Sequence, residues 1–391
     1  MPDVRQVELD LIRRDCADLV EVVRRLQASP ELGAAALGLP PYFALVAGES
    51  YSYLASPAAG NLRRTVGGTL FQQYAASVTK LRARVKLLDD TQGGLDGLVT
   101  TLGVARQKSL DWFLFPHTGL RGLFARRLQP DLGVFWVNEL PVASTHSALI
   151  TLGLREDEIA ALDLRTIEDE VGAFTLDWST AAGEYLARVS AIMATVGYQV
   201  DLNVDGGSTV DLSIAHTDHY GKVIYEHLAG SLGVGDELEA AVFFVLTQVG
   251  FANAVLPQFL PGDSILLLRA QYLTAYHATT ALRTLAALDA VPTSSMLGEF
   301  ASALLAGEDS AFLISNRELR NSFAHYALRK SARFLGDADA IGSVIEGVSG
   351  RSLSEVRSLA QRQLAAISAG FAGVASKPVF WPLRNAFGDN T

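Results

Sequence analysis

The residues best suited to chemistry in this sequence are Arg320, Asn321 and His325, which lie close together in the chain. An imidazole titrates near neutral pH, so His325 could both accept and donate a proton. The guanidinium of Arg320 stays protonated and offers several donors to a negatively charged group. Asn321, about one helical turn before His325, could hold the imidazole in one tautomer or bind an anionic oxygen. The three residue types therefore indicate proton transfer beside a stabilised negative charge.

These residues fall in a stretch whose pattern predicts a helix over 315–335. Ser315 could cap the amides of the first turn while Glu318, three residues later, reaches back, and Gly336 supplies a stop. Apolar residues recur at helical spacing on one face, namely Leu319, Phe323 and Tyr326 or Ala327. At about 100° per residue, the polar stripe holds Glu318, Asn321 or Ser322, and His325, with Arg320 beside it.

Residues 320–325 read Arg-Asn-Ser-Phe-Ala-His, and of the seven histidines only His325 has an arginine five positions before it. An arginine and a polar residue, followed after a short gap by a histidine on an amphipathic helix, resemble the signature of the HEPN superfamily. The resemblance implies a helical bundle that pairs two-fold, so that the Arg and His of two copies line a shared cleft. It also implies what is often found in that superfamily, metal-independent ribonuclease activity.

The resemblance assigns catalytic roles to His325 and Arg320. His325 would move a proton off the 2′-hydroxyl of RNA and onto the leaving 5′-oxygen. Arg320 would stabilise the charge that builds on the phosphoryl oxygens as the 2′-oxygen attacks. The expected protein is an endoribonuclease with a defence or toxin role, active as a homodimer because one Arg and His pair per chain is a sparse site. A protein inhibitor or antitoxin is a further expected partner.

Other interpretations of the same residues stay open. Arg320 could pair with a helical acid, Asn321 could bond the backbone, and His325 could be a half-buried histidine beside Tyr326. The protein would then be a non-catalytic HEPN-like dimer that binds a nucleotide, RNA or a protein partner, because a fold does not fix an activity. A purely structural helical scaffold is the third possibility.

Charge is spread unevenly along the chain. Residues 315–391 carry ten Lys or Arg and six Asp or Glu, a balance of +4, so the total of −10 leaves −14 on residues 1–314. The overall charge argues against a general nucleic-acid coat protein, but a local basic surface is available for phosphates. The candidate RNA-binding residues are Arg317, Arg329, Lys330 and Arg333. A solvated helix face is the alternative interpretation of these four.

The composition is that of a folded protein, with 49% hydrophobic and 19% charged residues in 391. The single Cys16 excludes an intramolecular disulfide and a Cys-based zinc site, which is compatible with a reducing cytoplasm. Charged residues interrupt the first positions, so no secretory signal is expected there and we expect a cytoplasmic protein. The uncharged segment 240–260 is better explained as a buried central helix than as a membrane span, because Gln248 and Asn253 lie within it.

The hydrophobic periodicity predicts an all-α protein of helical bundles with one minor β-hairpin. We expect an N-terminal helical domain of unassigned role over 1–199, a hairpin or boundary segment over 200–215, and a HEPN-like bundle over 216–376. An extended tail follows over 377–391. The hairpin prediction rests on two runs of alternating apolar residues on either side of Gly206-Gly207. They are Val200, Leu202 and Val204, and then Val210, Leu212 and Ile214. Gly and Pro residues over 29–60 predict a loop-rich connection, whereas 4–27 and 61–90 read as long helices.

Metal and cofactor chemistry has little support in the sequence. His216 and His219, with Asp218 between them and His227 farther on, could supply metal ligands on one helical face at i and i+3. A defined third and fourth ligand are lacking. No phosphate-binding loop, nucleophile elbow or kinase motif is present. We therefore expect neither a metal nor a cofactor.

Overall fold

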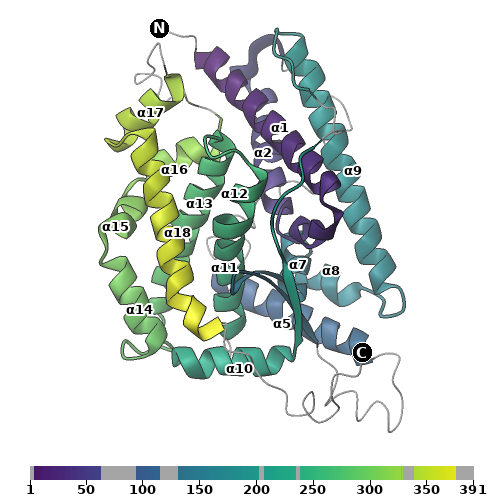
Figure 1. Cartoon of the computed structure of the whole chain (residues 1–391), viewed down its shortest axis with the longest axis vertical. Coiled ribbons are helices and arrows are strands. Elements are labelled where there is room, and N and C mark those ends of the chain that lie inside the picture. Colours follow the sequence, from purple (N-terminus) through teal and green to yellow (C-terminus); the bar gives the residue numbers. More distant parts are fainter. Residues whose placement is uncertain are drawn as a thin grey trace.

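The computed structural model describes residues 4–62, 94–114, 131–201, 207–234, 238–326, 328 and 339–375. Helices dominate these residues and the only strands among them form one small sheet, so the prediction of an all-α protein with a minor β element is confirmed. Figure 1 shows α11 near the centre of the molecule, with α18 on one side and α1 and α9 on the other. The predicted helix over 61–90 and the predicted tail over 377–391 fall almost wholly outside the described residues.

The N-terminal helix α1 spans Val4–Ala28, as its amphipathic pattern predicts. The loop-rich connection expected over 29–60 is wrong, since this region forms a 3₁₀-helix (Pro30–Leu37), α2 (Pro40–Leu54) and a second 3₁₀-helix (Pro57–Leu62). Proline at the first turn of a helix sacrifices no hydrogen bond, because that amide has no partner within the helix. Nearly the whole of α2 is buried, and this packing outweighs its helix-breaking composition.

The remaining helices of the described residues follow in chain order. They are α5 (Gly94–Leu114), α7 (Thr145–Thr151), α8 (Glu156–Ala161), α9 (Ile167–Ala194), α10 (Gly221–Leu232), α11 (Glu239–Gly250), α12 (Leu256–Phe259), α13 (Ile265–Ala286), α14 (Met296–Leu305), α15 (Glu308–Ser315), α16 (Arg317–Ala324), α17 (Ala340–Ser349) and α18 (Leu353–Ala375).

A π-helical turn over Phe251–Val255 joins α11 to α12. Pro257 explains it, because its ring nitrogen cannot donate to the carbonyl four residues earlier and the hydrogen-bond ladder must lengthen. The side-chain amide of Gln271 donates to the Ala252 carbonyl at 3.2 Å inside this turn. The whole span Glu239–Phe259 is long and apolar enough to cross a membrane, but 78% of its apolar window is buried among the other described elements. Burial of this span in the protein core matches the predicted central helix.

The sheet lies elsewhere than predicted. Strand β1 (Leu132–Val137) pairs antiparallel with β2 (Leu140–Ser144) and with β3 (Ala215–His219), in the order β2-β1-β3. Of the hairpin expected over 200–215, residues 202–206 lie outside the described residues. The second expected strand is wrong, since residues 207–214 form no strand and β3 begins at Ala215. The real hairpin turns at Asn138 and Glu139, both with positive φ, as a two-residue turn with matching twist requires.

One hydrophobic cluster includes residues from both sides of 200–215, from Leu9 to Phe371. Helix α1 packs against α2, α9 and α13, so the two parts of the chain share this core. The domain boundary at 200–215 stays a prediction, since shared packing does not report on independent folding.

Candidate functional site

Helix α16 is shorter than predicted. It spans Arg317–Ala324, and His325 has extended backbone angles (φ −129°, ψ 150°), so the prediction of one helix over 315–335 is wrong. Ser315 ends α15 and donates its hydroxyl to the Phe312 carbonyl at 3.2 Å, so it is not the expected N-cap. Asn316 separates the two helices because its backbone angles are not helical (φ −92°, ψ 60°), and its side-chain amide also donates to the Phe312 carbonyl, at 2.9 Å.

His325 is half-exposed and is held by a buried carboxylate. Its Nδ1 lies 2.7 Å from Oε2 of Glu49, whose side chain is 3% exposed against 44% for the histidine. A carboxylate only accepts hydrogen bonds, so Nδ1 donates and the neutral imidazole is fixed in the Nδ1–H tautomer. The second ring nitrogen, Nε2, is then the atom through which a substrate proton would be exchanged.

Glu49 did not emerge from the sequence reasoning, because it lies on α2, 276 residues before His325. The sequence nevertheless contains a signal that could have identified Glu49. Glu49 is the only charged residue between Glu31 and Arg63, in a stretch that is otherwise apolar or small. A buried carboxylate without compensation is costly, so a lone acid in such a stretch indicates a specific partner.

Arg320 and Asn321 lie on α16 and interact with each other. Nη1 of Arg320 donates to Oδ1 of Asn321 at 3.0 Å, and the guanidinium lies over the Tyr276 ring at 5.3 Å from its centre. Glu49, rather than Asn321, therefore bonds the Nδ1 atom of His325. The structure brings Arg320 against α13 and brings His325 against α2.

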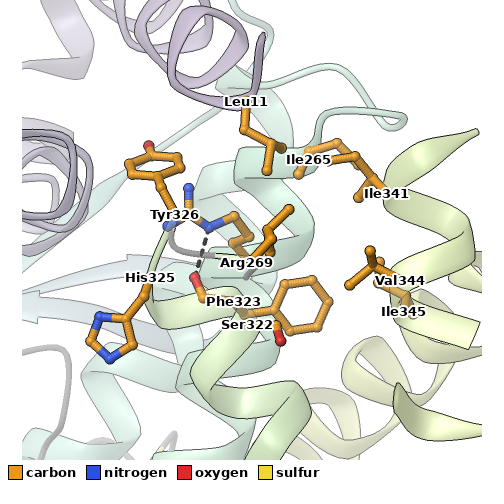
Figure 2. A pocket seen from close by; sticks show the side chains of 11 residues that line it. Leu11, Ile265, Arg269, Ser322, Phe323, His325, Tyr326, Ile341, Val344 and Ile345 are labelled. Carbon is orange, nitrogen blue, oxygen red and sulfur yellow. Dashed lines mark hydrogen bonds between the residues drawn. The ribbon is translucent and has the colours of Figure 1, made fainter. Parts of the chain in front are cut away.

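The chain around His325 is fixed by buried charges, shown in part in Figure 2. Arg269 donates from Nε to the Phe323 carbonyl at 2.7 Å, forms an ion pair with Asp15, and stacks on the Tyr326 ring at 4.4 Å. Tyr326 donates its hydroxyl to Oδ2 of Asp15 at 2.6 Å. Burial raises the pKa of the Asp15 carboxyl, although Arg269 and Tyr326 act to lower it. These contacts pull the chain out of the helical conformation directly after Ala324.

A cavity of about 20 Å³ lies beside this segment, which is room for about one water molecule. Arg269, Ser322, Phe323, His325 and Tyr326 line it together with apolar residues Leu11, Ile265, Leu328, Ile341, Val344 and Ile345. In Figure 2 the imidazole of His325 points away from the apolar side chains of α17. The cavity is therefore part of the packing behind the histidine and too small for a nucleotide.

The predicted RNA-binding residues are only partly described. Arg317 is exposed at the start of α16. Arg329, Lys330 and Arg333 lie outside the described residues. A basic surface beside His325 thus stays a prediction.

A second polar cluster surrounds His146, which the sequence reasoning did not single out. Its Nε2 lies 2.9 Å from the Asp131 carbonyl and must donate to it, so Nδ1 accepts from the Tyr225 hydroxyl at 3.0 Å. Burial lowers the pKa of His146 to about 4. Because its side chain is fully buried and both ring nitrogens are bonded, His146 is a neutral structural residue.

His216 and His219, both considered as metal ligands, lie on strand β3 rather than on a helix. His216 pairs with Asp218 at 3.3 Å, while Nε2 of His219 lies 2.6 Å from the Thr217 hydroxyl. Residues three apart on a strand face opposite sides of the sheet, so the expected shared face of His216 and His219 is wrong. The side chain of His227 is outside the described set. Among the side chains that are described, no group of three or more His, Cys, Asp or Glu could hold a metal ion.

No protein-family model, curated protein or solved structure matches this chain. The resemblance to the HEPN superfamily therefore stays a prediction that rests on residues 320–325.

Proposed function

We propose that this chain is a metal-independent endoribonuclease of the HEPN type, with His325 as general acid and base. The observation that carries the proposal is the 2.7 Å contact between Nδ1 of His325 and the buried Glu49. A half-exposed imidazole whose Nδ1 is held by a carboxylate is suited to acid–base catalysis, as in a Ser-His-Asp triad.

In the proposed reaction, Nε2 of His325 accepts the proton of a ribose 2′-hydroxyl as the 2′-oxygen attacks the adjacent phosphorus. The bond from phosphorus to the 5′-oxygen breaks, and the imidazolium returns its proton to that oxygen. The products are a 2′,3′-cyclic phosphate and a 5′-hydroxyl, so protons and electrons balance without a metal. Glu49 stabilises the imidazolium that forms between the two steps. Positioned proton transfer of this kind contributes about 10²- to 10⁴-fold in rate.

Arg320 would stabilise the phosphoryl charge. Its guanidinium is placed by the Tyr276 ring and by Asn321, which reduces the side-chain freedom lost when a phosphate binds. Arg317, exposed one turn earlier on α16, would add a phosphate contact, with Arg329, Lys330 and Arg333 as further candidates.

The same contacts of Arg320 favour a second candidate. A guanidinium engaged by its own helix and by α13 is also suited to a structural role. The alternative is a non-catalytic HEPN-like dimer that binds a nucleotide, RNA or a protein partner.

The proposal includes a homodimer, a cytoplasmic location, a defence or toxin role, and control by a protein inhibitor or antitoxin. These elements come from the resemblance and the composition. They are tested by the oligomeric state of the purified protein and by co-purified partners.

The test is RNA cleavage by the purified full chain in EDTA, comparing wild type with His325→Ala, Arg320→Ala and Glu49→Gln. His216→Ala and Arg351→Ala are matched controls, because His216 is an exposed histidine beside an aspartate and Arg351 lies over the Phe312 ring at 4.4 Å. We expect the first three to lose activity, the controls to keep it, and the products to end in 2′,3′-cyclic phosphate. An inert wild type, or equal cleavage by His325→Ala, overturns the catalytic proposal and leaves the binding alternative.

A further inference from the structure

The segment after α16 is held by acidic side chains from the two N-terminal helices. Glu49 of α2 accepts from His325, Asp15 of α1 accepts from the Tyr326 hydroxyl, and Glu8 of α1 accepts from the Leu328 amide at 2.7 Å. All three acids are at most 3% exposed. Three described residues of this segment, which belong to no helix or strand, are thus tied to helices more than 250 residues earlier in the chain.

Arg269 contacts the chain on both sides of His325. It bonds the Phe323 carbonyl, two residues before, and it stacks on the Tyr326 ring, one residue after. It is also paired with Asp15, which receives the Tyr326 hydroxyl. Asp15, Arg269 and Tyr326 therefore form one closed set of contacts, which we call the brace.

The brace is poorly explained by stability alone. Oδ1 of Asp15 and Nη2 of Arg269 are buried and have no hydrogen-bond partner within the described part of the chain. A buried ion pair with unsatisfied atoms loses much of its attraction to desolvation, and apolar replacements are often as stable. What the brace does provide is a fixed geometry, because each member limits the position of the other two.

We propose that Asp15, Arg269 and Tyr326 are positioning residues that fix the backbone around His325 and so keep its Nδ1 bonded to Glu49. The catalytic consequence rests on the proposed function, but the positioning itself does not. Without the brace, the extended segment could rotate and the imidazole would leave Glu49, since nothing in α16 itself requires the His325 backbone angles.

The ionisable groups around the pair come from four helices and from the segment itself. Besides the brace, Glu49 acts electrostatically on Tyr185 of α9, whose hydroxyl lies 2.5 Å from that of Ser50. Cys16 of α1 acts on both Tyr185 and Tyr326. None of these groups contains a ring nitrogen, so the ¹⁵N signals of His325 report its tautomer separately.

The experiment is ¹⁵N NMR of histidine-labelled full chain at alkaline pH, about pH 9, where imidazoles are neutral. Two-bond and three-bond couplings then show which ring nitrogen carries the proton. Tyr326→Phe removes one hydroxyl of the brace, and Tyr42→Phe is the matched control because Tyr42 is also buried and bonds Thr274 at 3.3 Å. His325→Gln assigns the signal, and His146 serves as an internal standard for the opposite tautomer.

We expect His325 in the wild type to be the Nδ1–H tautomer, and Tyr326→Phe to shift it to a mixture. Tyr42→Phe and the His146 signal should not change. A purely structural role for the brace would alter unfolding without altering the tautomer. If Tyr326→Phe does not fold, Asp15→Asn is read in the same way.

Retention of the Nδ1–H tautomer in the variant, or a mixture already in the wild type, overturns the proposal. An RNA cleavage assay on the same samples separates the two ideas. If the wild type does not cleave RNA but has the Nδ1–H tautomer, and Tyr326→Phe disturbs that tautomer, the ribonuclease proposal is rejected. The positioning role of the brace is then kept.

Discussion

His325 and His146 have the same side chain in opposite settings. His325 is 44% exposed and donates a hydrogen bond from Nδ1 to the buried carboxylate of Glu49. His146 is 1% exposed. Its Nε2 donates to a backbone carbonyl, and its Nδ1 accepts from the Tyr225 hydroxyl. A neutral carbonyl does not compensate a buried imidazolium, whereas a carboxylate does. The difference teaches that the partner and the exposure, rather than the residue type, separate a histidine suited to proton transfer from one that only packs.

The largest expected effect is on RNA cleavage, and it distinguishes the region around His325 from the region around His146 by their buried acids. Glu49→Gln should lower RNA cleavage by roughly 10²- to 10⁴-fold, because a glutamine amide can select the wrong imidazole tautomer and cannot stabilise the imidazolium. Glu239→Gln is the control, since Glu239 is also 3% exposed and faces Arg106 at 3.6 Å in the other region. Initial cleavage rates in EDTA measure both. Equal losses would mean that burial of any acid, and not the contact with His325, supports activity.

The next effect is a dependence of stability on pH. Burial lowers the pKa of His146 to about 4, below its value of about 6.5 in the unfolded chain, so the unfolded state binds the extra proton. The stability that His146 contributes is present above about pH 6.5 and falls as the pH drops toward 4, by roughly 2–3 kcal/mol at pH 4.5.

Urea midpoints of the wild type and of His146→Gln, each at pH 7 and pH 4.5, isolate this contribution by difference. The subtraction is needed because burial raises the pKa of Asp18 to about 6, which has the opposite effect. The variant should lose less stability on acidification than the wild type. An identical loss in both proteins would show that His146 is protonated without unfolding.

A smaller effect, on unfolding free energy and cleavage, separates Tyr225 beside His146 from Tyr326 beside His325. Tyr225→Phe removes the donor to Nδ1 of His146 and should cost about 1–2 kcal/mol of unfolding free energy while leaving cleavage unchanged. Tyr326→Phe should cost a similar amount and also lower cleavage. Thermal unfolding and cleavage rates of both variants test this contrast, and it fails if the two variants lose activity alike.

The smallest effect is in thiol labelling. Cys16 is the only cysteine, is fully buried, and burial raises its pKa, so a thiol reagent should not react with the native protein. Cys16 neighbours Asp15 and therefore reports opening of the brace. Labelling should be faster in Tyr326→Phe than in Tyr225→Phe at equal global stability. Equal rates would show that the brace does not open separately.

The sequence predicts a helix where apolar residues recur every three to four positions, as in α1. It misses α2, since Pro40, Pro41 and Gly48 are usual in loops and only burial shows why a helix forms there. It also misplaces the hairpin. Alternation over 200–214 looks like a strand, but a strand needs a neighbour, and the partner of β1 begins at Ala215.

The candidate site is predictable only in its local part. Arg320, Asn321 and His325 stand out by type and spacing, and Leu319 and Phe323 are buried as their spacing predicts. The end of α16 is not predictable, because Arg269 and Glu49 determine it through contacts across 54 and 276 residues. Sequence patterns report local preference, and long-range partners override it.

The contact between Glu49 and His325 also has a consequence for biosynthesis. At about 5–20 residues per second, a ribosome releases Glu49 roughly 15–55 seconds before His325. During that interval the nascent chain carries Glu8, Asp15 and Glu49 without the hydrogen-bond donors that the segment after α16 supplies. The N-terminal helices therefore cannot complete their packing until the segment after α16 emerges, and the chain acquires its acid–base pair only in the last stage of its folding.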